Sequence, residues 1–185
     1  MSSRVRASLV AAVVVAAAIA VLLAMGRPPI CTCGTVALWE PSAASARTSQ
    51  MLPDWYSPNH LVHGLLFYAG MWLAARNWSV ERRFLVALLV EVAWEVAENT
   101  PMVIDRYREA TIALGYTGDS VLNSVSDMAM MAVGFLAARK LPLWVAVALV
   151  AVLEIVPLLA IRDNLTLNVW MLVWPSEAIR SWQAG

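Results

Sequence analysis

Two apolar stretches that contain acidic residues, EVAWEVAEN at 91–99 and GDSVLNSVSD at 118–127, indicate both the fold and the candidate site of this protein. Ionisable side chains on membrane-length helices are costly to bury and usually serve a function. In the first stretch Glu91, Glu95 and Glu98 are spaced by four and then three residues, so they share one helix face. The first stretch therefore predicts a helix with an acidic stripe.

The second stretch and a histidine pair add two further polar stripes. Asp119, Asn123 and Asp127 follow one another at steps of four residues, which places them on one side of a helix that begins near Asp119. His60 and His63 are three residues apart and also share a helix face. We expect these three stripes to face one another in the interior of a helix bundle, because none of them suits a lipid-facing surface.

Composition places the chain in a membrane class. Of 185 residues, 61% are hydrophobic and 14% are charged, against about 45–50% and 25% in soluble domains, and the mean hydropathy is +0.67. Thirteen basic and thirteen acidic residues cancel, so no global field points to nucleic acid or anionic lipid. Nine tryptophans fit anchoring at the membrane–water interface. The chain is predicted to be one all-α, polytopic membrane domain, residues 1–185, with the lipid bilayer as its environment.

Five apolar stretches are predicted to span the membrane, and a sixth is too short to do so unaided. The sixth, 165–174, has ten residues, whereas a span needs about 20, so an interfacial or re-entrant helix is expected there. The first stretch exceeds the apolar core of a signal peptide, about 7–15 residues, which favours a retained helix. The predicted spans are about 7–25, 60–78, 84–99, 121–138 and 141–161.

Basic residues set the expected orientation. With the N-terminus in the cytoplasm, seven of the thirteen fall in short inner segments and six in longer outer ones, which fits the positive-inside rule. The polar stripes then meet at the outer leaflet of the membrane. The seven inner residues are Arg4, Arg6, Arg76, Arg82, Arg83, Arg139 and Lys140.

The connections carry their own expectations. The long loop 26–59 exceeds the usual loop length, so we expect it to dock on the outer face. Pro58 suits the first turn of the second span, and Asn59 is a candidate N-cap. The excursion 102–120 is too charged to lie in hydrocarbon.

Three interpretations of the polar stripes remain open at this point. Imidazole and carboxylate donors suit a divalent metal ion, although the pattern lacks the Glu-x-x-His pair of di-iron bundles. Alternatively, buried carboxyl groups perform acid–base chemistry on a phosphate or ester that arginine grips. The third interpretation is a structural hydrogen-bond network between helices. The candidates are Glu95, Glu98, Asp119, Asn123 and Asp127 for catalysis, Arg106, Arg108 and Asn99 for substrate binding, and His60 and His63 for a metal.

Two smaller features have weaker functional signals. Cys31 and Cys33 are separated by one residue, an awkward spacing for an internal disulfide, so they are interpreted as structural or incidental, with metal binding or redox chemistry as the alternative. Glu154 is expected either to pair with Arg162 two turns later or to join the polar cluster.

Four motifs in this order resemble a bacterial family of small inner-membrane proteins of unknown function. They are CTCG at 31–34, DWYSPNHLVHGLLFY at 54–68, EVAWEVAEN at 91–99 and GDSVLNSVSD at 118–127. The resemblance covers roughly residues 26–140. It implies a multi-pass plasma-membrane protein and supplies no activity.

A more distant resemblance is to VanZ-like membrane proteins, named after a teicoplanin-resistance protein. In that layout His63, Glu91 or Glu95, Asp119 and Asn123 occupy the matching positions. The glutamine of the family pattern is absent, and so is the arginine shortly before the aspartate. This resemblance concerns only the order and spacing of residues along the chain, so it is weak evidence for any particular chemistry.

We therefore expect a plasma-membrane protein with a polar outer-leaflet site. One hypothesis is a membrane-embedded enzyme acting on a lipid-linked or envelope substrate. The alternative is a non-catalytic membrane component that binds either a cofactor or a helix of another membrane protein. In that case the polar residues hold the helices together through hydrogen bonds.

Overall fold

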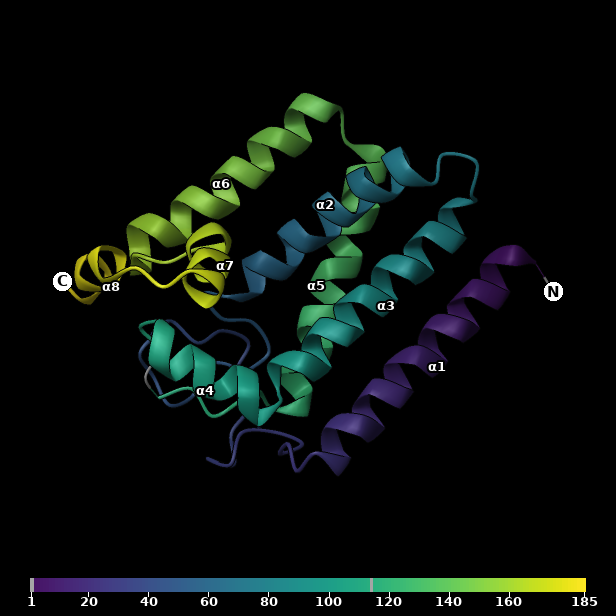
Figure 1. The fold of residues 1–185 in the computed structure, drawn as a ribbon. Helices are drawn as coiled ribbons and strands as arrows, with labels where there is room; N and C mark the ends of the chain where they lie inside the picture. The colour runs from purple at the N-terminus through teal and green to yellow at the C-terminus, as the bar shows by residue number, and fades with distance from the viewer. Residues whose placement is uncertain (1, 114) are drawn as a thin grey trace.

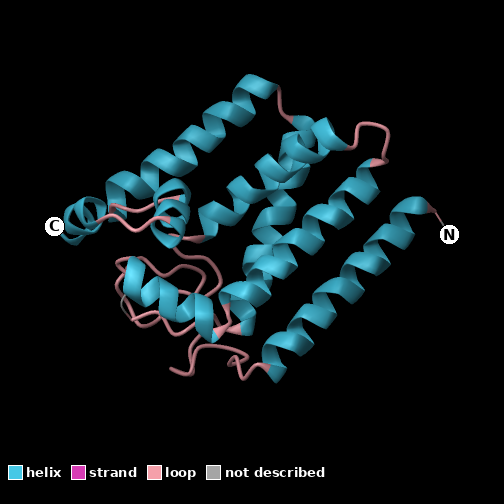
Figure 2. Cartoon of the chain, in the orientation of Figure 1, coloured by secondary structure: helices cyan, strands magenta, loops and turns pink. Residues whose placement is uncertain are grey.

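The computed structural model describes residues 2–113 and 115–185, and this part of the chain contains helices and loops and no β-strand (Figure 2). The prediction of an all-α fold is confirmed. Figure 1 shows the order and arrangement of the helices. They are α1 Ser3–Ala24, α2 Ser57–Ala74, α3 Val80–Glu98, α4 Pro101–Ala110, α5 Val121–Lys140, α6 Leu143–Ile161, α7 Leu165–Val173 and α8 Glu177–Ala184.

A helix occupies each of the six apolar stretches, and α4 and α8 are additional. α4 forms within the charged excursion because Thr100 caps it: the Thr100 hydroxyl accepts a hydrogen bond from the Val103 amide, and Pro101 occupies the first turn. α8 lies after Pro175 and begins at Glu177. Both are short polar helices, so hydrophobicity alone did not reveal them.

The core of the bundle is the contact between α2 and α5, which is the most extensive helix pair. Gly64 on α2 and Gly134 on α5 lie against each other, and a side chain on either would overlap with the backbone of the other helix. The two backbones approach closely because neither residue has a side chain. This contact fixes His60, one turn before Gly64, beside Asp127 on α5.

Three helices, α1, α5 and α6, are long and apolar enough to cross a membrane. α1 packs along α3 and α5, whereas α6 packs mainly along α2, and both leave most of their surface uncovered (Figure 1). Large exposed side chains such as Val13, Leu143 and Leu159 suit contact with lipid. α3 is less apolar because six of its residues are charged.

The connections gather at two opposite ends of the bundle (Figure 1). At one end, Arg4 Nε near the N-terminus lies 4.0 Å from Glu81 Oε1 at the start of α3. At the other end lie the loop 26–56, α4, α7 and α8, joined by contacts such as the Tyr107 hydroxyl donating to Asn168 Oδ1 at 3.0 Å. The chain therefore alternates between the ends in the order expected from the sequence.

The long loop docks onto the N-terminal end of α5. The amides of Val121 and Leu122 donate to the carbonyls of Pro28 and Pro29 at 2.9 and 3.1 Å. Further along the loop, the Gln50 side-chain amide donates to the Gly118 carbonyl at 2.7 Å. The bonds from Val121 and Leu122 satisfy helix-terminal amides that have no partner within α5 itself.

Three expectations about individual residues were wrong, namely those for the cysteine pair, for Asn59 and for Glu154. Cys31 and Cys33 form a disulfide, in a turn closed by the Gly34 amide donating to the Cys31 carbonyl. Asn59 is not the cap of α2, because the chain already turns at Asp54, whose carboxylate accepts from the Tyr56 amide at 2.8 Å, and α2 begins at Ser57. Pro58 does lie in the first turn of α2.

Glu154 neither pairs with Arg162 nor joins the polar cluster. Glu154 Oε2 accepts hydrogen bonds from the Thr166 amide at 3.1 Å and from the Thr166 hydroxyl. Arg162 ends α6 in a left-handed conformation, with φ of 56°, and its guanidinium donates to the Trp182 carbonyl at 3.0 Å. The left-handed turn directs the Arg162 side chain to α8 and away from Glu154.

Candidate functional site

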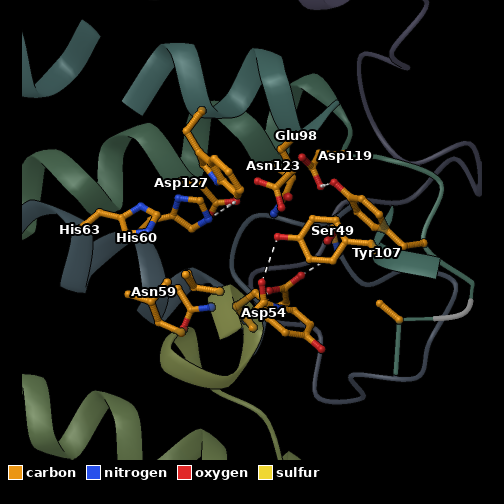
Figure 3. A pocket seen from close by; sticks show the side chains of 17 residues that line it. Ser49, Asp54, Asn59, His60, His63, Glu98, Tyr107, Asp119, Asn123 and Asp127 are labelled. Atoms are coloured by element: carbon orange, nitrogen blue, oxygen red, sulfur yellow. Dashed lines mark hydrogen bonds and ion pairs between the residues drawn. The ribbon is translucent and has the colours of Figure 1, made fainter. Parts of the chain in front are cut away.

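A cavity of about 130 Å³ lies at the end of the bundle that carries the long loop, α4 and α7 (Figure 3). One water molecule needs a cavity of at least about 10–15 Å³, so this space has room for several waters or a small polar group. Polar side chains from α2, α3, α4, α5, α7 and the loops around them line it. They include Ser49, Asp54, Tyr56, Asn59, His60, His63, Glu98, Tyr107, Tyr116, Asp119, Asn123, Asp127 and Asn168.

One buried carboxylate organises both histidines. Glu91 on α3 is fully buried, with Oε1 2.6 Å from His60 Nδ1 and Oε2 3.0 Å from His63 Nδ1. An imidazole that donates from Nδ1 to a carboxylate keeps Nε2 as its acceptor, and its ring orientation is fixed. His63 is the more exposed of the two rings, and both line the cavity.

Glu95, one turn after Glu91, is buried without a hydrogen-bond donor. It is 0% exposed, and neither of its carboxylate oxygens accepts a hydrogen bond from any residue that the structure describes. Its Oε1 lies 3.4 Å from His60 Nδ1. A buried carboxylate without donors is costly, because burial removes its water and nothing replaces it. The structural network interpretation does not account for Glu95.

Glu98, at the C-terminal end of α3, lines the cavity beneath α4 and α7. Tyr107 of α4 contacts it: burial, followed by the negative charge of Glu98 and a hydrogen bond to it, raises the pKa of the Tyr107 phenol. Tyr107 therefore stays protonated as a hydroxyl group. The same hydroxyl donates to Asn168 of α7, which connects the two helices across the cavity.

Asp119 is held in place just before α5 by two neighbours. The Asn99 amide donates to its Oδ2 at 2.7 Å, and the Tyr116 hydroxyl donates to its Oδ1 at 3.0 Å. Burial raises the pKa of Asp119 to about 6, and the two hydrogen bonds oppose that rise. Asp119 can therefore exchange a proton near neutral pH.

Two further carboxylates border the cavity. Asp127 Oδ2 on α5 lies 3.8 Å from His60 Nε2 (Figure 3), whereas Glu91 bonds to Nδ1 of the same ring. Asp54 is 2% exposed and accepts from the Ser49 amide at 2.6 Å. Burial raises the pKa of Asp54, and its bonds to backbone amides oppose that rise. The Asp54 bonds shape the loop, whereas Asp127 faces the imidazole.

The two asparagine candidates have partners within the chain. Asn99 connects α3 to Asp119, because its Oδ1 also accepts from the Asp119 amide at 2.7 Å. The Asn123 side-chain amide donates to the carbonyls of Met51 and Leu52 at 3.0 and 3.2 Å, so it anchors the long loop. Asn123 lines the cavity and Asn99 does not.

The two arginine candidates lie outside the cavity lining. Arg106 Nε donates to the Leu172 carbonyl at the end of α7 at 2.8 Å. Arg108 Nε donates to the Tyr116 carbonyl at 2.6 Å, and Arg108 also lies 3.5 Å from Asp105. In this structure they connect α4 to its surroundings.

The sequence-based candidate set missed Glu91, Asp54, Tyr107, Tyr116 and Asn168. Glu91 belonged to the same acidic stripe as Glu95, so the helical spacing already placed it on the right face. The tyrosines lie in the charged excursion 102–120 and Asn168 lies in the short apolar stretch 165–174, neither of which has a polar periodic pattern. The packing of α4 against α7 brings Tyr107 and Asn168 to the cavity.

The fold and the site together define an all-helical bundle with membrane-compatible helices around a buried polar cavity. A family model described as "Protein of unknown function (DUF2585)" matches residues 22–185, and the chain belongs to this family. It is 53% identical over 164 residues to a UPF0314 protein of Paracoccus denitrificans, covering 89% of this chain and 85% of that protein.

Other relatives match as extensively. A UPF0314 protein of Sphingopyxis alaskensis is 53% identical over 182 residues, covering 96% of this chain and 94% of that protein. The UPF0314 protein Atu8092 of Agrobacterium fabrum is 54% identical over 165 residues, covering 89% and 83%. No solved structure matches the chain. The resemblance to an uncharacterised bacterial family is confirmed.

Proposed function

We propose that this protein is a membrane-embedded enzyme whose cavity faces the outer leaflet of the bacterial plasma membrane and takes a lipid-linked or envelope substrate. Helices α1, α2, α3, α5 and α6 are its five membrane spans, and the N-terminus is cytoplasmic. Support for the orientation comes from the basic residues, since Arg4, Arg76 and Arg139 are all near the end of the bundle opposite the cavity.

The observation that carries the enzyme proposal is the cavity lining. Acidic groups, imidazoles and phenols converge on one small space that is covered by α4 and α7. A network that merely joins helices satisfies its own polar groups, whereas Glu95 has no donor among the described residues. Perturbed acidic groups in a small, partly enclosed cavity are characteristic of sites that transfer protons.

Hydrolysis of a phosphate or carboxylate ester is the chemistry that suits these groups. His63, oriented by Glu91, takes a proton from a water molecule as the water oxygen bonds to phosphorus or carbon. The bond to the leaving oxygen breaks, and Asp119 in its protonated form delivers a proton to that oxygen. Tyr107 and Tyr116 line the same cavity. Their hydroxyl groups, which donate to Asn168 and Asp119 in this structure, turn to the charged oxygens of the substrate when it binds.

A lipid-level comparison tests the proposal. The gene is deleted in a bacterium that carries it. Separate strains then receive the wild-type gene, the His63→Ala variant or the Asp119→Asn variant. Extracted lipids and lipid-linked envelope species are then compared by mass spectrometry, with membrane protein levels measured in parallel. We expect one species to accumulate in the deletion strain and to persist with both variants at normal protein levels.

Asp105→Asn is the matched control, because Asp105 is an exposed carboxylate on α4 that does not line the cavity. It should restore the wild-type profile. Identical lipid profiles in wild type and deletion strain, or full restoration by both cavity variants, would refute the enzyme proposal.

A further inference from the structure

The buried carboxylate of Glu95 lies beside two other groups that can bind a cation. One donor atom from each of His60, Glu95 and Glu98 lies within 4.8 Å of the other two. His60 and Glu95 are buried, and Glu98 is half-buried. Donors that share one ion at about 2.0–2.2 Å lie about 3–4 Å apart, so only small side-chain movements are needed to bring these three around an ion.

We propose that a divalent metal ion binds between α2 and α3, held by His60, Glu95 and Glu98. The independent observation is that both Glu95 oxygens are buried and lack a hydrogen-bond donor among the described residues. A cation supplies the charge compensation that those oxygens otherwise lack. This metal ion is the cofactor of the proposed enzyme. Its role in catalysis rests on the proposed function, whereas its binding does not.

A second set of possible ligands, His60, His63 and Glu91, is a poorer choice. Both oxygens of Glu91 already accept from an imidazole, at 2.6 and 3.0 Å, so Glu91 is satisfied without an ion. Hydrogen bonding of a ligand histidine to a buried carboxylate is a common arrangement around protein metals. Glu91 is therefore a positioning residue for the His60 ring, and His63 remains available at the cavity.

The donor set indicates the class of ion. Imidazole suits zinc and iron, and carboxylates suit harder ions such as manganese. One imidazole with two carboxylates is thus a mixed nitrogen–oxygen site for Zn²⁺, Fe²⁺ or Mn²⁺. The adjoining cavity leaves room for water or a substrate oxygen as a further ligand, which is the open position of catalytic metal sites.

Zinc binding to the full-length protein tests the site. The protein is purified in detergent with a histidine-free tag, stripped with EDTA, titrated with Zn²⁺ alone and analysed for retained metal by mass spectrometry. We expect about one ion per chain in the wild type. Glu95→Gln and Glu98→Gln should each weaken binding at least tenfold, whereas Glu154→Gln, a carboxylate on α6 outside the cluster, should bind as the wild type does.

A stability measurement separates loss of the site from loss of the fold. Glu95→Leu removes the unsatisfied carboxylate, so in EDTA its Tm should equal or exceed that of the wild type, while added Zn²⁺ should raise only the wild-type Tm. Wild-type protein that retains no zinc, or variants at Glu95 and Glu98 that retain it fully, would overturn the metal site.

The two proposals fail in different ways. If the lipid phenotype follows His63 and Asp119 but no zinc binds, the metal site is refuted and the enzyme stands. If zinc binds through Glu95 and Glu98 but the lipid profiles are unchanged, the enzyme is refuted and the metal site stands.

Discussion

Asp163 shows at the scale of one residue how burial shifts the proton affinity of a carboxyl group. It lies directly after α6 and is 1% exposed. Its Oδ1 accepts from the Asn164 amide at 3.0 Å and from Gln183 Nε2 at 3.1 Å, and the Tyr56 hydroxyl lies 3.4 Å from Oδ2. Burial raises the pKa of Asp163 to about 6, although these hydrogen bonds oppose that rise.

The raised pKa predicts a pH-dependent cost to stability. Below about pH 4 the Asp163 carboxyl is protonated in both the folded and the unfolded protein. Between about pH 4 and 6 the unfolded chain releases the proton and the folded protein keeps it, so rising pH favours unfolding. The difference between a pKa of 3.8 and about 6 corresponds to about 3 kcal/mol in the free energy of unfolding. Above pH 6 the protein has lost this whole amount of stability.

Asp163→Asn removes this titration. Its Tm, measured in detergent from pH 4 to 7, should fall less across pH 4–6 than that of the wild type. Asp105→Asn, at an exposed carboxylate of α4, should follow the wild-type curve. If the curves of Tm against pH were parallel for the wild type and Asp163→Asn, the raised pKa of Asp163 would be contradicted.

Glu91 illustrates why a single side chain can determine the geometry of a whole site. Its two oxygens bond two different imidazoles, so one carboxylate sets the ring orientation of both His60 and His63. The helical spacing of α3 then places Glu95 and Glu98 on the same face. The cluster therefore depends on one face of one helix meeting the histidine face of α2.

At the scale of the helix, the close contact of α2 and α5 depends on two glycines. Gly64 lies against the backbone of Met131 and Phe135, and Gly134 lies against the carbonyl of Leu61. A methyl group at Gly64 would overlap with these backbone atoms, which cannot move independently of α5. The helices would have to separate, and His60 would move away from Asp127.

Gly64→Ala should therefore destabilise the protein by at least about 2 kcal/mol, at the middle of the range for overpacked sites. Gly70→Ala is the matched control on the same helix, because nothing lies within 4 Å of a methyl group there. That change should be neutral or stabilising by up to about 1 kcal/mol through helix propensity. Thermal unfolding in detergent measures both, and equal effects would argue against the glycine contact.

At the scale of the whole molecule, the number of membrane spans depends on whether α2 and α3 cross the bilayer. Within residues 2–113 and 115–185, only α1, α5 and α6 have the length and apolarity of simple spans. α2 and α3 carry the polar cluster, and their polar residues face each other in the bundle interior. Polar residues directed inward are compatible with a membrane span, since lipid does not contact them.

Fusions to alkaline phosphatase, which is active only outside the cytoplasm, test the five-span topology. Fusions after Asn77 and after Lys140 should be inactive, and a fusion after Ala113 should be active. If only α1, α5 and α6 crossed the membrane, the Asn77 fusion would be active as well. Reversed activity at all three positions would instead place the N-terminus outside.

Much of the fold follows from local pattern. Each of the six apolar stretches is a helix. In an apolar environment the backbone N–H and C=O groups need hydrogen-bond partners, and a helix supplies them within the segment itself. α4 and α8 did not follow, since neither is a hydrophobic run. α4 depends on its Thr100 cap, and α8, which has no side-chain cap, is joined to the end of α6 by Gln183 Nε2 donating to Asp163 Oδ1 at 3.1 Å. The Cys31–Cys33 disulfide likewise depends on the conformation of the turn around Gly34.

The sequence by itself determined the helical class and the shared faces of the acidic and histidine stripes, because helical periodicity is a local property. Only the tertiary structure decided which polar groups satisfy one another. It paired Glu91 with both histidines, gave Asn99 and Asn123 partners within the chain, and left Glu95 without a donor among the described residues. The physical reason is that hydrogen bonds between segments depend on how closely those segments approach, which is a property of the packed structure; for α2 and α5 two glycines set that distance.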